Sequence, residues 1–322
     1  MNNVYINRKD NLSKFRLASL YFASAFVLLA LLGLFTKGLN LGLDFTGGYL
    51  TEFSTEQSIT QSEMTGLLSS YLPDGFKLSS TENGTYWSVQ QADNLINIQE
   101  KPWLTEFSQQ SGLNITPQDA IYIGSQVGDE LIDQGGLALL ASVLVILLYL
   151  SVRFEWRLAS GSVIALFHDV IVVLGIFAWF DIPFDLTIVA SLLAIIGYSL
   201  NDSIIIGDKV REIMKRNVDI PSNIDAKSDI NEKSDKNIDS IINIAIKATI
   251  VRTLITSGTT LATILAIWIF AGESLVGFSI ALFSGVLVGT FSSITISATV
   301  PQLLGLSVDY YQDRVGEVCQ LP

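Results

Sequence analysis

The sequence contains few charged residues and only one cysteine. Charged residues make up 16% of the 322 residues and hydrophobic residues 49%. A typical soluble globular chain carries about 25% charged residues, so this balance argues against an ordinary soluble protein and indicates a membrane-embedded chain. Because Cys319 is the single cysteine, no disulfide can form within the chain, and redox chemistry is not expected.

Motifs of common enzymes are also missing. Residues 37–133 contain no nucleotide-binding loop, no cluster of metal ligands and no Ser/His/Asp arrangement for nucleophilic catalysis. No hydrolase or transferase site is visible in the sequence, so we do not expect an enzyme in the ordinary sense. A binding or scaffolding module is the simplest interpretation of this segment.

Six apolar runs approach the length of about 20 residues that a helix needs to cross a bilayer. They lie over residues 16–36, 134–152, 158–180, 186–207, 250–270 and 276–304. The sixth is long and is expected to bend or to leave the membrane early. A secretory signal peptide is the alternative for residues 1–36, but the apolar part exceeds the roughly 7–15 residues of a signal core and no small-x-small cleavage site is evident. We therefore favour a retained helix.

The charges of the connecting segments predict the topology. Residues 1–16 hold four basic groups and one acid, whereas residues 37–133 hold thirteen acids and three lysines. Basic groups also lie in the turn over 151–157 and directly after the fourth span. Because basic loops stay in the cytoplasm, we expect a multi-pass inner-membrane protein whose parts outside the bilayer are a cytoplasmic N-terminus (1–15), an external domain (37–133), a cytoplasmic loop (208–249) and a cytoplasmic tail (305–322).

The external segment has the pattern of a small α+β domain. The stretches "GGYLTEFST", "TYWSVQQ" and "AIYIGSQV" favour strands, and "TEQSITQSEMTGLLSSYL" has helical spacing with Ser58 or Thr60 as its cap. About 95 residues suffice for a compact domain. By contrast, residues 217–240 are rich in Asn, Asp, Ser and Lys and are expected to form a flexible cytoplasmic linker. A regulatory contact of this loop is left open.

Small residues recur at steps of four in the sixth span. They are Ala281, Gly285, Gly289, Ser293 and Ser297. This spacing puts them on one helical face, where small side chains let helix backbones approach closely. The pattern predicts a helix-packing seam, either within the bundle or against a partner, and not a catalytic role for the serines.

Four ionisable residues remain inside the predicted spans. They are Asp169 and the adjacent His168 in the third span, Asp202 in the fourth, and Arg252 near the start of the fifth. One charge at the centre of a bilayer costs at least about 2.5–3.5 kcal/mol, so such residues usually face a bundle interior or a water-filled path. A purely structural bridge between Asp202 and Arg252 is one explanation.

The neighbouring polar residues favour a coupling role instead. Asp202 follows Asn201 and shares a helical face with Tyr198 and Ser199. Arg252 begins a row of hydroxyl side chains that continues at Thr256, Thr259, Thr260 and Thr263. Two such polar faces would form a wettable seam in which a carboxylate binds and releases a cation. Moving Arg252 relative to Asp202 would then change the cation affinity of the carboxylate, as coupling of ion flow to motion requires.

His168 and Asp169 point about 100° apart on a helix, so they cannot both face one seam squarely. We expect Asp169 to enter the polar interior. For His168, a titrating role and a packed, hydrogen-bonded neutral imidazole are both left open.

Four stretches together resemble the SecF members of the SecD/SecF family of bacterial protein-export membrane proteins. They are "LGLDFTGG" (41–48), "RFEWRLASGSVIALFHDV" (153–170), "DLTIVASLLAIIGYSLNDSIIIGDKVRE" (185–212) and "RTLITSGTT" (252–260). The first stretch alone would also fit SecD members. The single six-span unit with "FEWR" and "IGYSLND" favours the SecF members.

The resemblance implies half of a transporter bundle of the resistance–nodulation–division (RND) type. It implies that the chain pairs with SecD, that the pair associates with the SecYEG channel and YajC, and that it promotes preprotein export after SecA has acted. A proton or sodium gradient would supply the energy, with no cofactor beyond the transported ion. The family's ion-coupling carboxylate falls on Asp202, its fifth-span arginine on Arg252, and its His-Asp pair on His168 and Asp169.

Two departures and two alternatives accompany this resemblance. The chain has "DKVRE" from Asp208 where the family commonly has "DRIRE", and its 217–240 segment looks longer than usual. An RND-type exporter of lipids or small molecules would predict twelve spans or a homodimer, and a larger external domain. An assembly factor that does not couple to ions would tolerate loss of the intramembrane charges.

Overall fold

The computed structural model describes residues 11–72, 76–80, 84–91, 103–218, 230–270 and 275–306. The chain divides into two compact units. The first contains residues 1–39, 141–182 and 190–322, and the second contains residues 40–140 and 183–189. Cys319 and most of the predicted tail lie outside the described residues.

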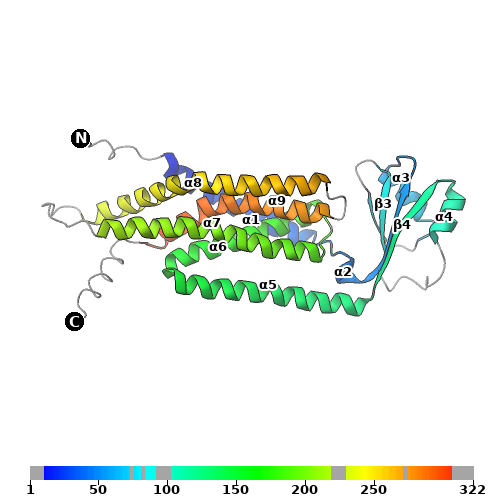
Figure 1. Cartoon of the computed structure of the whole chain (residues 1–322), viewed down its shortest axis with the longest axis horizontal. Coiled ribbons are helices and arrows are strands. Elements are labelled where there is room, and N and C mark those ends of the chain that lie inside the picture. Colours follow the sequence, from blue (N-terminus) through cyan, green and yellow to red (C-terminus); the bar gives the residue numbers. More distant parts are fainter. Residues whose placement is uncertain are drawn as a thin grey trace. The chain divides into compact units, whose positions relative to one another are not determined.

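Six helices are long and apolar enough to cross a membrane. They are α1 (Asn11–Thr36), α5 (Ser125–Arg153), α6 (Trp156–Phe180), α7 (Leu186–Val218), α8 (Ile230–Phe270) and α9 (Val276–Ser292), the last continued by α10 (Ala298–Leu303). The helices of the first unit run alongside one another (Figure 1). Together with the small α+β domain between α1 and α5, they confirm the predicted fold class.

The helices differ in how much of their surface this chain covers. Half or more of the apolar window is buried in α6, α7 and the α9–α10 span, but only 22% in α1, 17% in α8 and 6% in α5. The first three therefore form the centre of the bundle. The other three leave large apolar faces for lipid or a partner.

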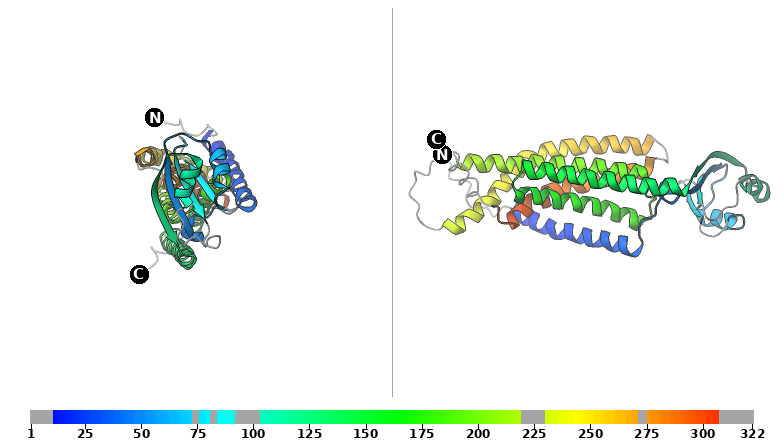
Figure 2. Two further views of the ribbon diagram at one scale, coloured as in Figure 1. Left: turned by 90° about the vertical axis from the view of Figure 1, so that its right-hand side faces the viewer. Right: turned by 90° about the horizontal axis from the view of Figure 1, so that it is seen from below.

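Close contacts between α1 and α6 depend on small residues. Gly175 of α6 faces Ala30 of α1 with no room for a Cβ atom. The Trp179 indole lies against Gly33, and its Nε1 donates a 2.8 Å hydrogen bond to the Leu29 carbonyl. Figure 2 shows α1 (blue) alongside α6 (green). The missing or small side chains at Gly33, Ala30 and Gly175 let the backbones of α1 and α6 approach closely, as in other membrane helix bundles.

The sixth span is interrupted as expected. A π-helical turn (Ser293–Ser297) separates α9 from α10, and Pro301 lies inside α10. Proline has no N–H to donate to the carbonyl four residues earlier, here that of Ser297. Gly161 of α6 packs against this carbonyl, where a Cβ atom would lie 2.6 Å from the oxygen. The irregular turn thus has a specific packing partner.

The cytoplasmic loop expected over 208–249 was wrong in extent. Helix α7 continues to Val218 and α8 already begins at Ile230, so both ends of this segment are helical, and residues 219–229 lie outside the described residues. The extensions are helical because they bury an apolar stripe of their own. Its members include Val210, Met214, Ile238, Ile241, Ile242, Ala245 and Ile246. Their helical spacing was visible in the sequence and was overlooked among the polar residues.

A buried arginine joins three helices at this end of the bundle. Arg16 of α1 is 1% exposed and forms a 2.8 Å ion pair with Asp239 of α8. It also donates a hydrogen bond to Gln302 of α10. Because an unpaired buried charge is costly, this contact fixes α1 against α8 and α10.

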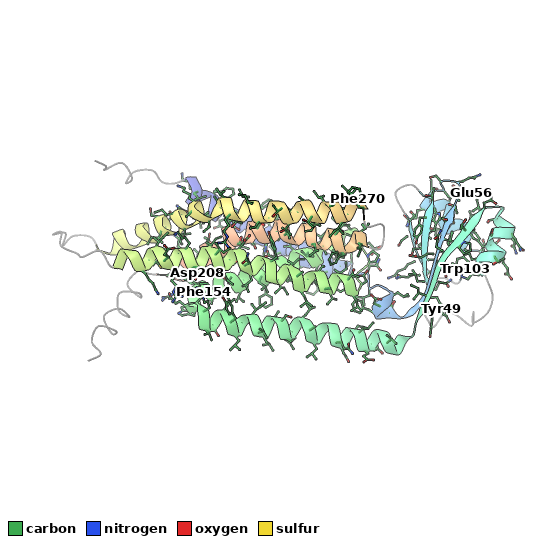
Figure 3. The ribbon with its side chains drawn as sticks, in the orientation of Figure 1. Tyr49, Glu56, Trp103, Phe154, Asp208 and Phe270 are labelled. Atoms are coloured by element: carbon green, nitrogen blue, oxygen red, sulfur yellow. The ribbon has the colours of Figure 1, made fainter. Side chains whose placement is uncertain are left out.

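The second unit contains a four-stranded antiparallel sheet in the order β2-β3-β1-β4. The strands are β1 (Gly48–Thr55), β2 (Lys77–Ser80), β3 (Tyr86–Gln91) and β4 (Ile115–Ile123). Trp87 and Val89 point to the same buried face because side chains alternate along a strand. They pack with α3 (Gln61–Leu68) and α4 (Trp103–Ser111) around Phe53, Met64 and Phe107. Figure 3 labels Trp103 and Glu56 in this domain.

Local expectations for this domain were partly right. The first two predicted strands correspond to β1 and β3, and Thr60 is the N-cap residue of α3, although its side chain makes no capping hydrogen bond. The strand expected through "AIYIGSQV" was wrong at its end. It stops at Ile123, because the Gly124 carbonyl already accepts the Val127 N–H as α5 begins.

Candidate ion-coupling site

Asp169 lies at a junction of three central helices. It is 1% exposed, and its Oδ2 accepts hydrogen bonds from Ser199 of α7 and, at 2.8 Å, from Ser292 of α9. Its Oδ1 lies 2.9 Å from His168 Nδ1. Gly289 of α9 lies beside this group, where a Cβ atom would be 3.1 Å from Ser199 Cβ and 3.4 Å from Asp169 Oδ2. Asp169 is therefore a buried carboxylate with several hydrogen-bond partners.

His168 is buried on a different side of α6. Its ring lines an apolar groove between α1 and α6, together with Tyr21, Ser24 and Phe167. While Nδ1 contacts Asp169, Nε2 is buried and makes no hydrogen bond with the described residues. His168 and Asp169 thus point in different directions from α6, and the contact between them is the one from His168 Nδ1 to Asp169 Oδ1.

Asp202 differs from Asp169 in its hydrogen bonding. It is also 1% exposed, yet its Oδ2 accepts no hydrogen bond from the described residues. The hydroxyls of Tyr198 and Ser203, on the preceding turn and the next residue of α7, are buried without partners as well. Burying polar atoms in this way is unfavourable. The group therefore has unused capacity to bind a proton, a cation or water.

Arg252 lies near Asp202 without pairing with it directly. Its positive charge acts electrostatically on the Asp202 carboxylate. No ion pair within 4.0 Å joins the two among the described residues. Arg252 is exposed in this chain, and it lines a polar pocket between α7 and α8 with Asp208, Lys209 and Glu212. The pocket also contains Ile205, one turn after Asp202.

The predicted threonine row does not face the bundle interior. The hydroxyls of Thr256, Thr259, Thr260 and Thr263 all donate to carbonyls of their own helix. Thr259 and Thr263 are exposed in this chain, as is Asn201 of α7. Asn201, Thr259 and Thr263 therefore lie on faces that this chain leaves uncovered, whereas Thr256 and Thr260 are half-buried.

A different row of α8 faces inward. Thr249, Thr253 and Ser257 are buried, and Ser257 hydrogen-bonds Thr290 of α9 at 2.7 Å. Sequence reasoning missed this row, although its members also recur at steps of four. They could have been recognised because they continue the apolar positions Ala245 and Ile246, which mark the buried face of the helix.

The small residues of the sixth span lie inside the bundle. All five are buried, with Gly285 against Ile195 of α7 and Gly289 against Ser199. Ser297 Oγ lies 3.4 Å from Ser162 Oγ of α6. This face of small residues, which also includes Ala281 and Ser293, lets the sixth span pack closely on α6 and α7. These two helices carry Asp169 and Asp202.

Two of the sequence stretches meet at one end of α7. Arg153 Nη2 lies 2.7 and 2.8 Å from the two carboxylate oxygens of Asp208. Arg211 also donates to the Arg153 carbonyl, and Figure 3 labels Phe154 and Asp208 in this region. The contact anchors the end of α7 to the turn between α5 and α6.

Comparison with known proteins identifies the family. Residues 104–306 match the model "Protein export membrane protein SecD/SecF, C-terminal", and residues 32–59 match the "SecD/SecF GG Motif". The chain belongs to the SecD/SecF family. The SecF subunit of the protein translocase of Pseudomonas aeruginosa is 38% identical over 85% of this chain and 84% of its own length. The SecF subunit of Vibrio alginolyticus is 36% identical over 85% and 83%.

Solved SecDF structures have the same fold. SecDF from Thermus thermophilus, described as a translocon-associated membrane protein, has a TM-score of 0.73 and 29% identity over 93% of this chain. SecDF in a super-membrane-facing form has a TM-score of 0.60 and 27% identity over 99%. The chain spans 39% and 40% of those longer chains. This member of the SecD/SecF family is thus a multi-pass membrane component that corresponds to part of SecDF.

Proposed function

We propose that the chain is the SecF subunit of a bacterial Sec translocase and works with SecD. Together they would use the proton or sodium gradient to promote preprotein export through SecYEG, after SecA has pushed the preprotein and with YajC as an accessory. The proposed setting is the inner membrane with both termini in the cytoplasm. Membership of the SecD/SecF family and the likeness to SecDF support this function.

The observation that carries the proposal is the state of Asp202. A carboxylate inside a membrane helix is costly unless it is paired. Among the described residues, none hydrogen-bonds Asp202 Oδ2, and Arg252 acts on this carboxylate only from beyond ion-pair distance. Binding a proton or a sodium ion would neutralise it. Release would follow when Arg252 approaches, because two positive charges would then compete for one carboxylate.

Asp169 is assigned a different part in the same scheme. Its hydrogen bonds from Ser199 and Ser292 hold one carboxylate oxygen between α7 and α9. Ser199 lies one turn before Asp202 on α7, so a shift of α7 would alter the bonds to Asp169. Asp169 therefore acts as the fixed point against which α7 moves, while Asp202 takes up and releases the ion.

The energy available to this cycle is sufficient for mechanical work. One elementary charge that crosses a potential of 100 mV supplies about 2.3 kcal/mol. A few such transfers would therefore support repeated movements of helices and of the domain between α1 and α5.

The test is Asp202→Asn in a strain or vesicle system that depends on this chain. Asn keeps the shape of the side chain and cannot exchange a proton or hold a cation by charge. We expect ion-driven stimulation of export to disappear, with SecD still co-purifying. Asp181→Asn is the matched control, since Asp181 is exposed at the end of α6 in a left-handed conformation that Asn also tolerates. Wild-type stimulation in Asp202→Asn would contradict the proposal and favour a non-coupling assembly factor.

The driving ion is identified by a second comparison. Inverted vesicles that contain the complex are given a proton gradient alone or a sodium gradient alone, and export is measured in each. One gradient should suffice, and the same gradient should have no effect on the Asp202→Asn complex. Equal export with neither gradient would contradict ion coupling.

A further inference from the structure

The "LDFTGG" stretch docks on the start of helix α7. Asn40 O accepts the Phe184 N–H at 2.8 Å, and Phe184 O accepts the Gly42 N–H at 2.7 Å. These bonds make an isolated parallel bridge between Leu41 and Phe184. The Phe45 ring stacks on Phe184 with 5.8 Å between ring centroids. Residues 40–140 and 183–189 form one compact unit, so these contacts lie within it.

Asp44 makes the contact that distinguishes this docking from simple packing. Its Oδ2 accepts a 2.9 Å hydrogen bond from the backbone N–H of Leu186, the first residue of α7. Asp185 Oδ1 accepts the next two N–H groups, those of Thr187 and Ile188. The first N–H groups of a helix have no partner within the helix, and a carboxylate there is favoured by the helix dipole. Asp44 therefore caps a helix that begins 142 residues later.

The same stretch leads directly into the sheet. The four-residue helix α2 (Leu43–Thr46) ends at Gly47, and Gly48 is the first residue of β1, which lies between β3 and β4. Gly47 and Gly48 have φ angles of 64° and 127°. Only glycine adopts both readily. The glycine pair thus forms a short covalent connection between the cap on α7 and an inner strand.

Helix α7 is continuous from Leu186 to Val218. At 1.5 Å per residue, Asp202 lies about 24 Å along the helix from its capped end. A helix without a break transmits a shift or rotation along its whole length. Movement caused at Asp202 would therefore arrive at Leu186 and act on Asp44.

We propose that Asp44 is a positioning residue that couples α7 to the sheet domain. Its hydrogen bond to Leu186 keeps the "LDFTGG" stretch on the first turn of α7, so that movement of α7 during ion binding is passed through Gly47 and Gly48 to β1. This inference rests on the function proposed above for Asp202. It assigns a mechanical role to the acidic residue of the glycine-pair motif.

The experiment uses the full chain reconstituted with its SecD partner. Cation flux through the vesicle membrane and ion-stimulated export are measured side by side for Asp44→Ala, Asp44→Asn and Glu63→Ala. Asn offers an oxygen that can still accept the Leu186 N–H, so it tests rescue by a conservative change. Glu63 is an exposed acid on α3 of the same unit and is the matched control.

We expect Asp44→Ala to keep cation flux while stimulated export falls about tenfold, within the 5–150-fold typical of coupling between sites. Asp44→Asn should lose less, and Glu63→Ala should match the wild type. Export by Asp44→Ala at the level of Glu63→Ala would overturn the proposal. Parallel loss of flux and export in an assembled Asp44→Ala complex would also overturn it, because Asp44 would then act on the ion site and not on coupling.

The experiment also distinguishes failed assembly of Asp44→Ala from failure of the function proposed for Asp202. If Asp44→Ala fails to assemble with SecD, Asp44→Leu decides, because leucine fills the space of Asp44 and cannot accept the Leu186 N–H. A fall in export with intact flux supports the proposal, and full export overturns it. Failure of the proposed function itself would be seen in Asp202→Asn, as unchanged flux and export. That result does not depend on any Asp44 variant.

Discussion

Ser292 Oγ donates a 2.8 Å hydrogen bond to Asp169 Oδ2 and so joins α9 to α6 in the centre of the bundle. Ser199 of α7 donates to the same oxygen. Three helices therefore share one buried carboxylate oxygen. Asp202, almost one turn further along α7, has no such support on its Oδ2 from any residue that the structure describes. This contrast between two buried acids separates a structural junction from a group that is available for ion exchange.

Ser292→Ala should weaken the junction at Asp169. The change removes one donor from a buried carboxylate, and we expect a loss of about 1–2 kcal/mol of stability. The measurement is thermal unfolding of the complex with SecD in detergent. Ser284→Ala is the control, because that hydroxyl donates only to carbonyls of its own helix. Equal melting of the two variants would show that the Asp169 junction does not contribute to stability.

Arg252→Met should abolish ion-driven stimulation of export, down to the level seen without a gradient. The side chain is exposed in this chain and forms no direct ion pair with Asp202. Its loss should therefore leave assembly intact, and co-purification with SecD separates loss of coupling from misfolding. Lys247→Met removes an exposed positive charge from the same helix and serves as the control. Full stimulation in Arg252→Met would show that the charge is not needed to release the ion.

Asp239→Ala should destabilise the end of the bundle where α1, α8 and α10 meet. It leaves Arg16, 1% exposed, without its ionic partner. Breaking a buried pair costs about 3–5 kcal/mol, and we expect the lower end because Asp239 is 28% exposed. Chemical denaturation of the complex measures the change.

The double variant Arg16→Met/Asp239→Leu tests the cause of that loss. It removes both charges, so most of the stability should return. If the double variant is as unstable as Asp239→Ala, lost packing and not an unpaired charge explains the effect.

Composition and spacing were enough for the membrane fold. The backbone N–H and C=O groups of six long apolar runs need hydrogen-bond partners inside the bilayer. A helix supplies these partners within each run, and hydrocarbon offers none. The strand-favouring residues of "GGYLTEFST" and "TYWSVQQ" likewise predicted β1 and β3. The polar extensions of α7 and α8 were missed, since the isoleucines at 238, 241, 242 and 246 stand among charged residues that favoured a loop.

The candidate site shows where local patterns stop being informative. The acids and the arginine were found because any charge in an apolar run is conspicuous. On α8, the sequence drew attention to Thr256, Thr259, Thr260 and Thr263 and not to Thr249, Thr253 and Ser257, since several rows of hydroxyls share the same helical spacing. The inward row is identified by the burial of Thr253 and Ser257 and by the hydrogen bond between Ser257 and Thr290 of α9.

The order of residues alone therefore establishes which segments enter the membrane and which ionisable groups go with them, because the cost of transfer into hydrocarbon depends on each side chain separately. The folded chain decides the partners: two serines for Asp169, Leu186 for Asp44 and, within the part of the chain that the structure describes, none for Asp202 Oδ2. Hydrogen bonds require groups within about 3 Å of each other. That proximity arises between residues 30, 123 and 142 positions apart only when the helices and the sheet domain have packed.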